Sequence, residues 1–386
     1  MSDFTNLKLK KIKLEKLGAL AIFALFTVAS FLTGSSVSEA AISKTALPIS
    51  FGGTGASTQS TALTNLGINN TIDENSSNST FPSAKTVYDY TKNELEPDTP
   101  KSVFIASANN SCHSCFSTSL TSLNNGASWE SKSIGNNTLR GIAYGDGTFI
   151  MVSVGNLGIF RSTDKGQNWS SLSYTVDLYS ITFGNGVFVA VGDSGNIMRS
   201  TDLGVTWTSA TVGTISRYGV AFRNGVFIAV GDNGNIVRST DLGTTWTSAT
   251  VGTISRYGVA FRNGVFIAVG DDGNIMRSTD LGATWTSATV GTKKLRTITY
   301  GNNTWIILGF DTVLRSTDNG KTWQQSSLGY NGYGIAYGNK TFIGVGRATN
   351  DSYGYIFTST DDGLSWKLVY SITTNNYNQI YGIATD

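Results

Sequence analysis

The chain has 386 residues, of which 14% are charged and 11% aromatic, with 44 glycines and four prolines. This composition suits one large or two ordinary domains and favours turn-rich β structure over helices. Residues 1–40 hold five of the 28 basic and three of the 26 acidic residues, so the remainder carries 23 of each. A neutral chain without a basic stripe argues against a nucleic-acid-binding protein.

Residues 1–40 have the order of a secretory signal peptide. Five lysines precede an apolar run, Leu17–Leu32, and small residues follow at Ser38 and Ala40. We expect cleavage after Ala40 and export to a secreted, periplasmic or cell-surface location. The alternative is an uncleaved anchor helix, but a run of 16 apolar residues is shorter than the ~20 that span a bilayer.

Residues 41–100 are expected to form a linker or stalk. All four prolines lie before residue 101, and the segment is rich in Ser, Thr and Asn. The pieces "GGTGA", "ALTNLGI" and "SAKTVYDY" resemble connector modules of bacteriophage tail-fibre proteins, which implies an extended element that can form a homotrimer. The alternative is a flexible linker with one short helix near residues 84–95.

Two cysteines, Cys112 and Cys115, flank the single histidine, His113. A zinc site usually needs four ligands, and no further Cys or His is left to complete one. A haem-attachment motif places His after the second Cys, and a thioredoxin-like pair needs a βαβ context. In an exported protein we therefore expect a local disulfide, with no metal and no cofactor.

Residues 101–386 are built from a repeat. The twin segments 208–246 and 247–285 differ at three positions only. Each repeat contains the motif S-x-D-x-G-x-T-W, whose tryptophans lie 38 to 43 residues apart. The aspartates and tryptophans of its six full copies are Asp164 and Trp169, Asp202 and Trp207, Asp241 and Trp246, Asp280 and Trp285, Asp318 and Trp323, and Asp361 and Trp366. A seventh, degenerate copy has Asn124 in place of the aspartate.

Each repeat contains four short strand signals, which in residues 218–250 read YGVAF, VFIAVG, NIVRST and TWTSAT. Asn224-Gly225 predicts a tight hairpin, and the apolar run VFIAV predicts a strand covered on both faces. Four antiparallel strands in a ~40-residue period predict an all-β, seven-bladed β-propeller. Because the first repeat lacks its first strand, we expect Tyr381–Asp386 to supply it and close the ring.

The recurring motif resembles the Asp-box, or BNR, repeats of sialidase-like propellers, over residues 101–386. The "GIAYG" and "FIAVG" strands are also similar to those of photosystem II assembly-factor propellers. We expect Ser and Asp to bond nearby backbone N–H groups, Gly to take the left-handed turn position, and Trp to pack between blades. Because copies spaced around a ring cannot converge on one ligand, the motif is interpreted as structural.

The candidate binding site lies at the end of the propeller opposite to the Asp-boxes, where the first strand of each blade begins beside the channel. There tyrosine faces can stack on sugars, and arginines can bind carboxylates in a bidentate manner. The candidates are Arg140, Tyr179, Tyr218, Tyr257, Arg296, Tyr333 and Tyr381 at the strand starts, Arg217 and Arg256 in the twins, and Asp193, Asp232 and Asp271 in the second-to-third turns. The alternative is that these side chains simply fill a narrow channel.

We expect a non-catalytic binding protein that recognises a glycan or a protein. A sialidase-like hydrolase would need a tyrosine nucleophile with a partner glutamate, yet Glu130 is the sole glutamate beyond residue 100. Other glycosidases use two placed carboxylates, an option that Asp177 and Asp193 leave open. A third alternative is an extracytoplasmic assembly factor similar to the photosystem II factors, with an arginine-lined face for a partner protein. Membrane contact is expected through residues 1–40 alone.

Overall fold

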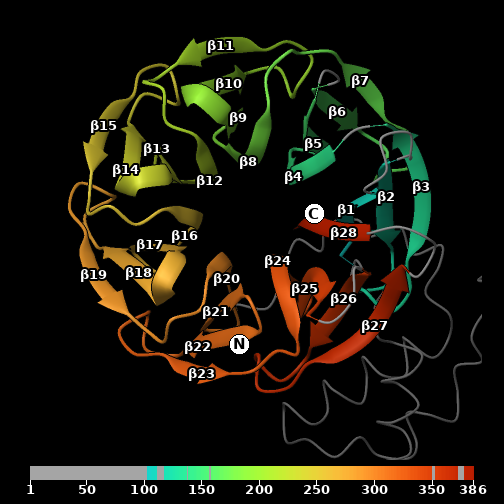
Figure 1. Cartoon of the computed structure of the whole chain (residues 1–386). Helices are drawn as coiled ribbons and strands as arrows, with labels where there is room; N and C mark the ends of the chain where they lie inside the picture. Colours follow the sequence, from blue (N-terminus) through green and yellow to red (C-terminus); the bar gives the residue numbers. More distant parts are fainter. Residues whose placement is uncertain (1–101, 111–116, 137, 156–157, 350–352, 373–377) are drawn as a thin grey trace, which may run out of the picture. The chain divides into compact units, whose positions relative to one another are not determined.

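The computed structural model describes residues 102–110, 117–136, 138–155, 158–349, 353–372 and 378–386, all within the unit Asp98–Asp386. The described residues form seven four-stranded antiparallel sheets arranged around a central axis (Figure 1). The predicted seven-bladed β-propeller is therefore confirmed. In this part of the chain no helix is long and apolar enough to cross a membrane.

Several sequence-based expectations fall on residues outside the described ranges. These are the signal peptide, the tail-fibre-like stalk with its helix near residues 84–95, and the disulfide between Cys112 and Cys115. They stay predictions.

Blade 1 consists of β28, β1, β2 and β3, and each later blade takes the next four strands of the chain. The innermost strands of blades 1 to 7 are β28 (Asn378–Thr385), β4 (Thr138–Gly145), β8 (Leu178–Gly184), β12 (Arg217–Arg223), β16 (Arg256–Arg262), β20 (Leu295–Gly301) and β24 (Tyr330–Gly338). The second strands are β1 (Phe104–Asn110), β5 (Thr148–Val154), β9 (Val187–Gly192), β13 (Val226–Gly231), β17 (Val265–Gly270), β21 (Thr304–Gly309) and β25 (Thr341–Ala348). The third strands are β2 (Ser117–Ser122), β6 (Ile159–Ser162), β10 (Asn196–Ser200), β14 (Asn235–Ser239), β18 (Asn274–Ser278), β22 (Thr312–Ser316) and β26 (Gly354–Ser359). The outermost strands are β3 (Glu130–Gly135), β7 (Ser170–Leu172), β11 (Thr208–Thr211), β15 (Thr247–Thr250), β19 (Thr286–Thr289), β23 (Gln324–Ser326) and β27 (Lys367–Ile372). One-turn 3-10 helices follow the second strands of blades 3, 4 and 5, namely η4 (Asp193–Gly195), η5 (Asp232–Gly234) and η6 (Asp271–Gly273).

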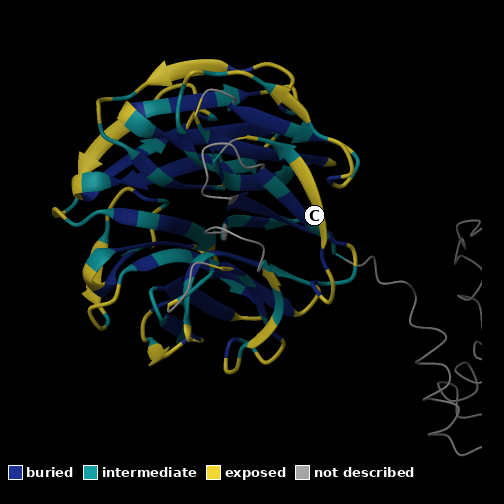
Figure 2. Ribbon diagram, turned by 45° about the vertical axis from the view of Figure 1, so that its right-hand side comes forward, coloured by how far each residue is buried: buried dark blue, intermediate teal, exposed yellow. Residues whose placement is uncertain are grey.

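Blade 4 shows how the sequence produces these layers. Every residue of β13, VFIAVG, is buried, because neighbouring blades cover both of its faces. Every residue of β15, TSAT, is exposed at the rim, where Figure 2 shows the outer strands in yellow. The hairpin between β12 and β13 turns at Asn224 and Gly225, whose φ angles are 48° and 78°, the left-handed values that an Asn-Gly turn supplies at least cost.

The ring closes in blade 1 by pairing segments from opposite ends of the propeller. Strand β1 pairs with β2 on one side and with β28 on the other, with Phe104 opposite Thr385. The backbone N–H of Val103 also donates to Oδ1 of Asp386 at 2.8 Å. This pairing confirms the expected closure and covers the inner edge of β1.

The hydrophobic core is divided into clusters between neighbouring blades. Between blades 3 and 4, Val189 and Ile197 pack against Phe227 and Ala229, with Trp246 at the edge of the cluster. The ring centroids of Phe227 and Trp246 are 6.3 Å apart. Every such cluster holds one motif tryptophan: Trp129, Trp169, Trp207, Trp246, Trp285, Trp323 and Trp366. The tryptophans therefore join blades, as expected.

The Asp-box turn of blade 4, residues 239–246, uses its polar groups internally. Ser239 Oγ donates to Asp241 Oδ1 at 2.8 Å and accepts the Gly243 N–H at 2.9 Å. Asp241 also accepts the backbone N–H and the hydroxyl of Thr245, and Trp246 Nε1 donates to the Gly243 carbonyl. The hydrogen bonds from Thr245, with that from Ser239, lower the pKa of Asp241 to about 2. The Asp241 carboxylate therefore bonds within its own turn, which supports the interpretation of the Asp-box as a structural motif.

Arginines of the third strands tie five of the Asp-box turns to the preceding blade. Arg199 of blade 3 donates from Nε to the carbonyl of Leu242 in the blade 4 turn at 2.7 Å. The other such contacts are Arg161 to Leu203, Arg238 to Leu281, Arg277 to Asn319 and Arg315 to Asp362. Two third strands have a threonine in place of this arginine. They are β2, with Thr121 at the junction of blades 1 and 2, and β26, with Thr358 at the junction of blades 7 and 1.

Candidate binding site at the channel mouth

The starts of the innermost strands surround one cavity of about 650 Å³ on the channel axis, a volume in the range of about 300–1,000 Å³ that ligand sites occupy. Each blade contributes the same position to its lining. These seven residues, here called the ring, are Arg140, Tyr179, Tyr218, Tyr257, Arg296, Tyr333 and Tyr381. The sequence-predicted strand-start residues thus meet around one cavity.

Tyrosines of blades 3, 4 and 5 form one arc of the ring. The ring centroids of Tyr179 and Tyr218 are 5.2 Å apart, and those of Tyr218 and Tyr257 are 5.3 Å apart. Burial is the main cause that raises the pKa of all three, and nearby aspartates raise the pKa of Tyr179 and Tyr218 further. These hydroxyls therefore stay protonated at neutral pH, and those of Tyr218 and Tyr257 donate hydrogen bonds.

The remaining arc contains two arginines placed over tyrosine rings. Arg296 lies 4.5 Å from the ring centroid of Tyr257 and 5.9 Å from that of Tyr333. Tyr333 stacks on Tyr381 at 5.3 Å, and Arg140 lies 4.0 Å over Tyr381. Cation–π contact of this kind holds the guanidinium groups in place without neutralising them.

The three predicted aspartates stand beside the ring and not in the cavity lining. Asp232 accepts the hydroxyl of Tyr218 at 2.9 Å, and Asp271 accepts that of Tyr257 at 2.7 Å. Asp193 is held instead by the hydroxyl of Ser216 at 2.5 Å, a bond that is the largest cause of its lowered pKa. Asp232 and Asp271 therefore orient two tyrosines of the arc, and Asp193 and Asp232 give that side of the mouth a negative charge.

Arg217 and Arg256 do not belong to the ring, contrary to expectation. They are 1% and 2% exposed and lie inside the blades, because consecutive residues of a strand face opposite sides. Arg217 donates from Nη2 to the Val212 carbonyl at 2.6 Å, and Arg256 does the same to Val251 at 2.7 Å. Burial lowers the pKa of Arg217 to about 10. The register places Leu178 and Leu295 at the same position in blades 3 and 6.

Sequence reasoning missed Arg347 and Phe310, which also line the cavity. Both follow the last glycine of a second strand, the position that Asp193, Asp232 and Asp271 hold in blades 3 to 5. An alignment of the repeats on that glycine places Phe310 and Arg347 at the same position as the three aspartates. This alignment could have identified both residues from the sequence. The mouth therefore changes from acidic at blades 3 and 4 to basic at blades 6, 7 and 2.

Among the described residues, those that line the cavity include no carboxylate, and Glu130 lies exposed in the outer strand β3. The described residues also hold no cluster of three or more His, Cys, Asp and Glu side chains suited to a metal ion. Three arginines line the cavity, Arg140, Arg296 and Arg347. Their Nε atoms are buried and have no hydrogen-bond partner among the described residues.

The BNR/Asp-box repeat model matches residues 314–325, the motif of blade 6. Among solved structures, the chain is similar to YCF48 bound to D1 peptide, with 17% identity, a TM-score of 0.51 and coverage of 64% of this chain and 90% of that chain. It is similar to YCF48 from Cyanidioschyzon merolae, with 18% identity, a TM-score of 0.50 and coverage of 65% and 94%. It is also similar to a chain in the crystal structure of a mitotic checkpoint complex, with 9% identity, a TM-score of 0.53 and coverage of 64% and 80%.

A comparison with curated protein sequences returned no match. At these identities, the likeness to the solved structures is one of fold. The chain carries the Asp-box repeat on a propeller fold that it shares with the YCF48 structures.

Proposed function

We propose that this protein is a non-catalytic binding propeller whose channel mouth receives an acidic segment of a partner protein. The observation that carries the proposal is that three arginines, Arg140, Arg296 and Arg347, line one cavity. No carboxylate of the described residues forms an ion pair with any of them. Guanidinium groups bind carboxylates with paired, charge-assisted hydrogen bonds, so an acidic ligand matches the site.

A peptide fits the mouth better than a glycan. Sugar stacking needs open aromatic faces, but the ring tyrosines face one another at about 5 Å or lie under Arg140 and Arg296. A peptide can use the arginines without displacing this stack. The similar YCF48 structure that was solved with a D1 peptide adds support for a peptide ligand.

The lining gives no support to hydrolysis. A retaining or inverting glycosidase needs two carboxylates at the reacting centre, and none of the lining residues that the structure describes carries one. The tyrosines have raised pKa values, which is the opposite of what a tyrosine nucleophile requires.

Residues 1–100 carry a separate proposal about location. Their charged start, apolar run Leu17–Leu32 and small residues before Ala41 support export of the propeller on a stalk. Fractionation of cells that express the full chain tests it. An exported product that begins at Ala41 is expected, and a full-length product in the cytoplasm would contradict the proposal.

Fluorescence anisotropy with fluorescein-labelled hexaglutamate tests the binding proposal. We expect saturable, salt-sensitive binding, no binding of labelled hexaglutamine, and a loss of about tenfold or more in affinity for each of R140Q, R296Q and R347Q, because a charge-assisted bond contributes about 1.5–3 kcal/mol. The variant K321Q changes a charge on the opposite, Asp-box face and is expected to bind as the wild type does. Equal binding of hexaglutamine, or unchanged binding by all three arginine variants, would overturn the proposal. Binding of 3′-sialyllactose in place of the peptide would point to a glycan.

A further inference from the structure

We propose that Lys294 determines the charge specificity of the mouth, by neutralising Asp271 so that Arg296 presents an uncompensated positive charge to the ligand. The proposal rests on the proposed function and names the residue that separates the acidic from the basic side of the site.

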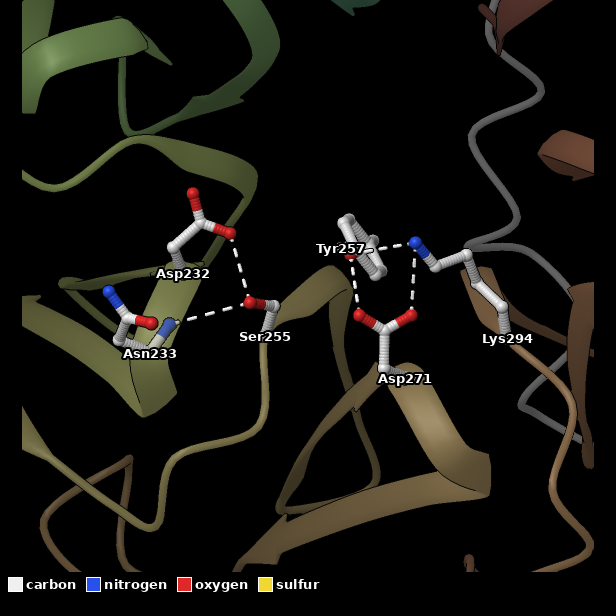
Figure 3. Close-up of polar contacts among 6 residues, drawn as sticks. All are labelled: Asp232, Asn233, Ser255, Tyr257, Asp271 and Lys294. Carbon is white, nitrogen blue, oxygen red and sulfur yellow. Dashed lines mark hydrogen bonds and ion pairs between the residues drawn. The ribbon is translucent and has the colours of Figure 1, made fainter.

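The repeats supply the comparison. The residue two positions before the ring is serine in blades 4 and 5 but lysine in blade 6. Ser255 Oγ donates to Asp232 Oδ1 at 2.9 Å, whereas Lys294 Nζ lies 3.0 Å from Asp271 Oδ1 (Figure 3). A serine satisfies the carboxylate and leaves its charge in place, as it does for Asp232. A lysine at the same position removes that net charge.

Lys294 is fixed by a second contact. Its Nζ donates to the hydroxyl of Tyr257 at 2.9 Å, and the same hydroxyl donates to Asp271 Oδ2 at 2.7 Å (Figure 3). Although burial acts in the opposite direction, the hydrogen bonds with Tyr257 and Asp271 raise the pKa of Lys294, so the ammonium stays charged over the neutral range. The lysine and Asp271 side chains are each about one third exposed, which keeps solvent screening of the pair incomplete.

Arg296 shares the same tyrosine. The cationic groups of Lys294 and Arg296 both lie 4.5 Å from the ring centroid of Tyr257, and the hydroxyl of that ring is bonded to Asp271. Without the lysine, the carboxylate would offset the guanidinium charge at the blade 5–6 side of the mouth. With it, the positive side runs from Arg296 through Arg347 to Arg140, with uncharged Tyr381 of blade 1 between the last two.

This arrangement specifies the ligand further. An acidic peptide is expected to place its carboxylates over blades 6, 7 and 2. Negative groups are disfavoured over blades 3 and 4, where Asp193 and Asp232 keep their charge beside uncharged Ser216 and Ser255. Lys294 therefore determines which side of the mouth the carboxylates of the ligand occupy.

The test measures hexaglutamate affinity at low ionic strength for a set of matched variants. K294S installs the residue of the twin repeats, K294R keeps the charge, and K294S/D271N removes the lysine together with the carboxylate that it neutralises. K321S removes a lysine from the exposed Asp-box turn of blade 6 on the opposite face. Thermal melts of all variants report whether the fold is kept.

We expect K294S to weaken binding about 3- to 10-fold, an effect of one unit charge that shrinks as salt is added. K294R, K294S/D271N and K321S are expected to bind within about twofold of the wild type. Wild-type affinity in K294S, or failure of D271N to restore binding to K294S, would overturn the role of Lys294 while leaving the proposed function intact. If the wild type itself does not bind hexaglutamate, the proposed function fails first.

Discussion

Replacing the buried guanidinium of Arg217 by an apolar side chain is expected to stabilise the propeller. Arg217 is 1% exposed, and no described carboxylate pairs with it. Burial lowers its pKa to about 10, which corresponds to a penalty of about 3 kcal/mol for the charged form at neutral pH. Because the pKa of this basic group is lower in the folded state, the penalty applies in full below about pH 10 and fades above it.

The variant R217L places in blade 4 the residue that blades 2, 3 and 6 already have there, namely Leu139, Leu178 and Leu295, all 0% exposed. The lost hydrogen bond to Val212 costs about 1 kcal/mol, which offsets part of the penalty that is relieved. We therefore expect a net gain of about 1–2 kcal/mol, with the melting temperature rising by about 2–4 °C per kcal/mol.

The twin blade supplies the matched comparison. In R256L, the Oδ1 atom of Asn274 would lose the bond that it accepts from Arg256 Nε at 3.2 Å, so we expect a smaller gain, by about 1 kcal/mol. Thermal and urea unfolding of the wild type and both variants measure the difference. A lower melting temperature for R217L would refute the reasoning, since the contacts of the guanidinium would then outweigh the cost of burying it.

Two further predictions concern the Asp-box face. Hydrogen bonds from the Thr or Ser four residues later are the main cause that lowers the pKa of four aspartates to about 2, namely Asp202, Asp241, Asp280 and Asp361. Because the pKa of these acids is lower in the folded state, they stabilise the fold above about pH 4, and this stabilisation is lost as the pH falls towards 2. Urea midpoints measured from pH 7 to pH 2 are expected to fall over that window, and a flat profile would contradict the assignment. The variant T121R supplies the arginine that the junction of blades 1 and 2 lacks and is expected to add about 0.5–1.5 kcal/mol through a bond to the Lys165 carbonyl, the counterpart of Leu203. A melting temperature at or below that of the wild type would show that this junction does not accept the contact.

Much of the fold follows from short-range sequence signals. Asn224-Gly225 specifies its hairpin locally, and the motif around Asp241 specifies a turn whose own side chains bond within eight residues. Closure was also predictable, since the strand that blade 1 lacks is supplied after Tyr381. These features depend on neighbours in the sequence or on counting copies of one motif.

The site was predictable only where it follows the repeat. The ring residues share one position at the strand start, so they were found together. Arg217 was misplaced because adjacency to Tyr218 was treated as proximity, whereas strand alternation separates them. The contact of Lys294 with Asp271 joins two blades and depends on side-chain geometry that no local pattern encodes.

The pairing of β1 with β28 joins two strands that the ribosome translates at very different times. Val103 and Asp386, which are bonded across this pair, are 283 positions apart in the chain. At about 5–20 residues per second, translation from one to the other takes roughly 15–60 s. Throughout that interval β1 has a partner in β2 but exposes its other edge, with the apolar side chains of Phe104 and Ile105 beside it. The nascent chain is therefore most open to aggregation through blade 1, and a chaperone or a low local concentration matters most just before the final strand emerges.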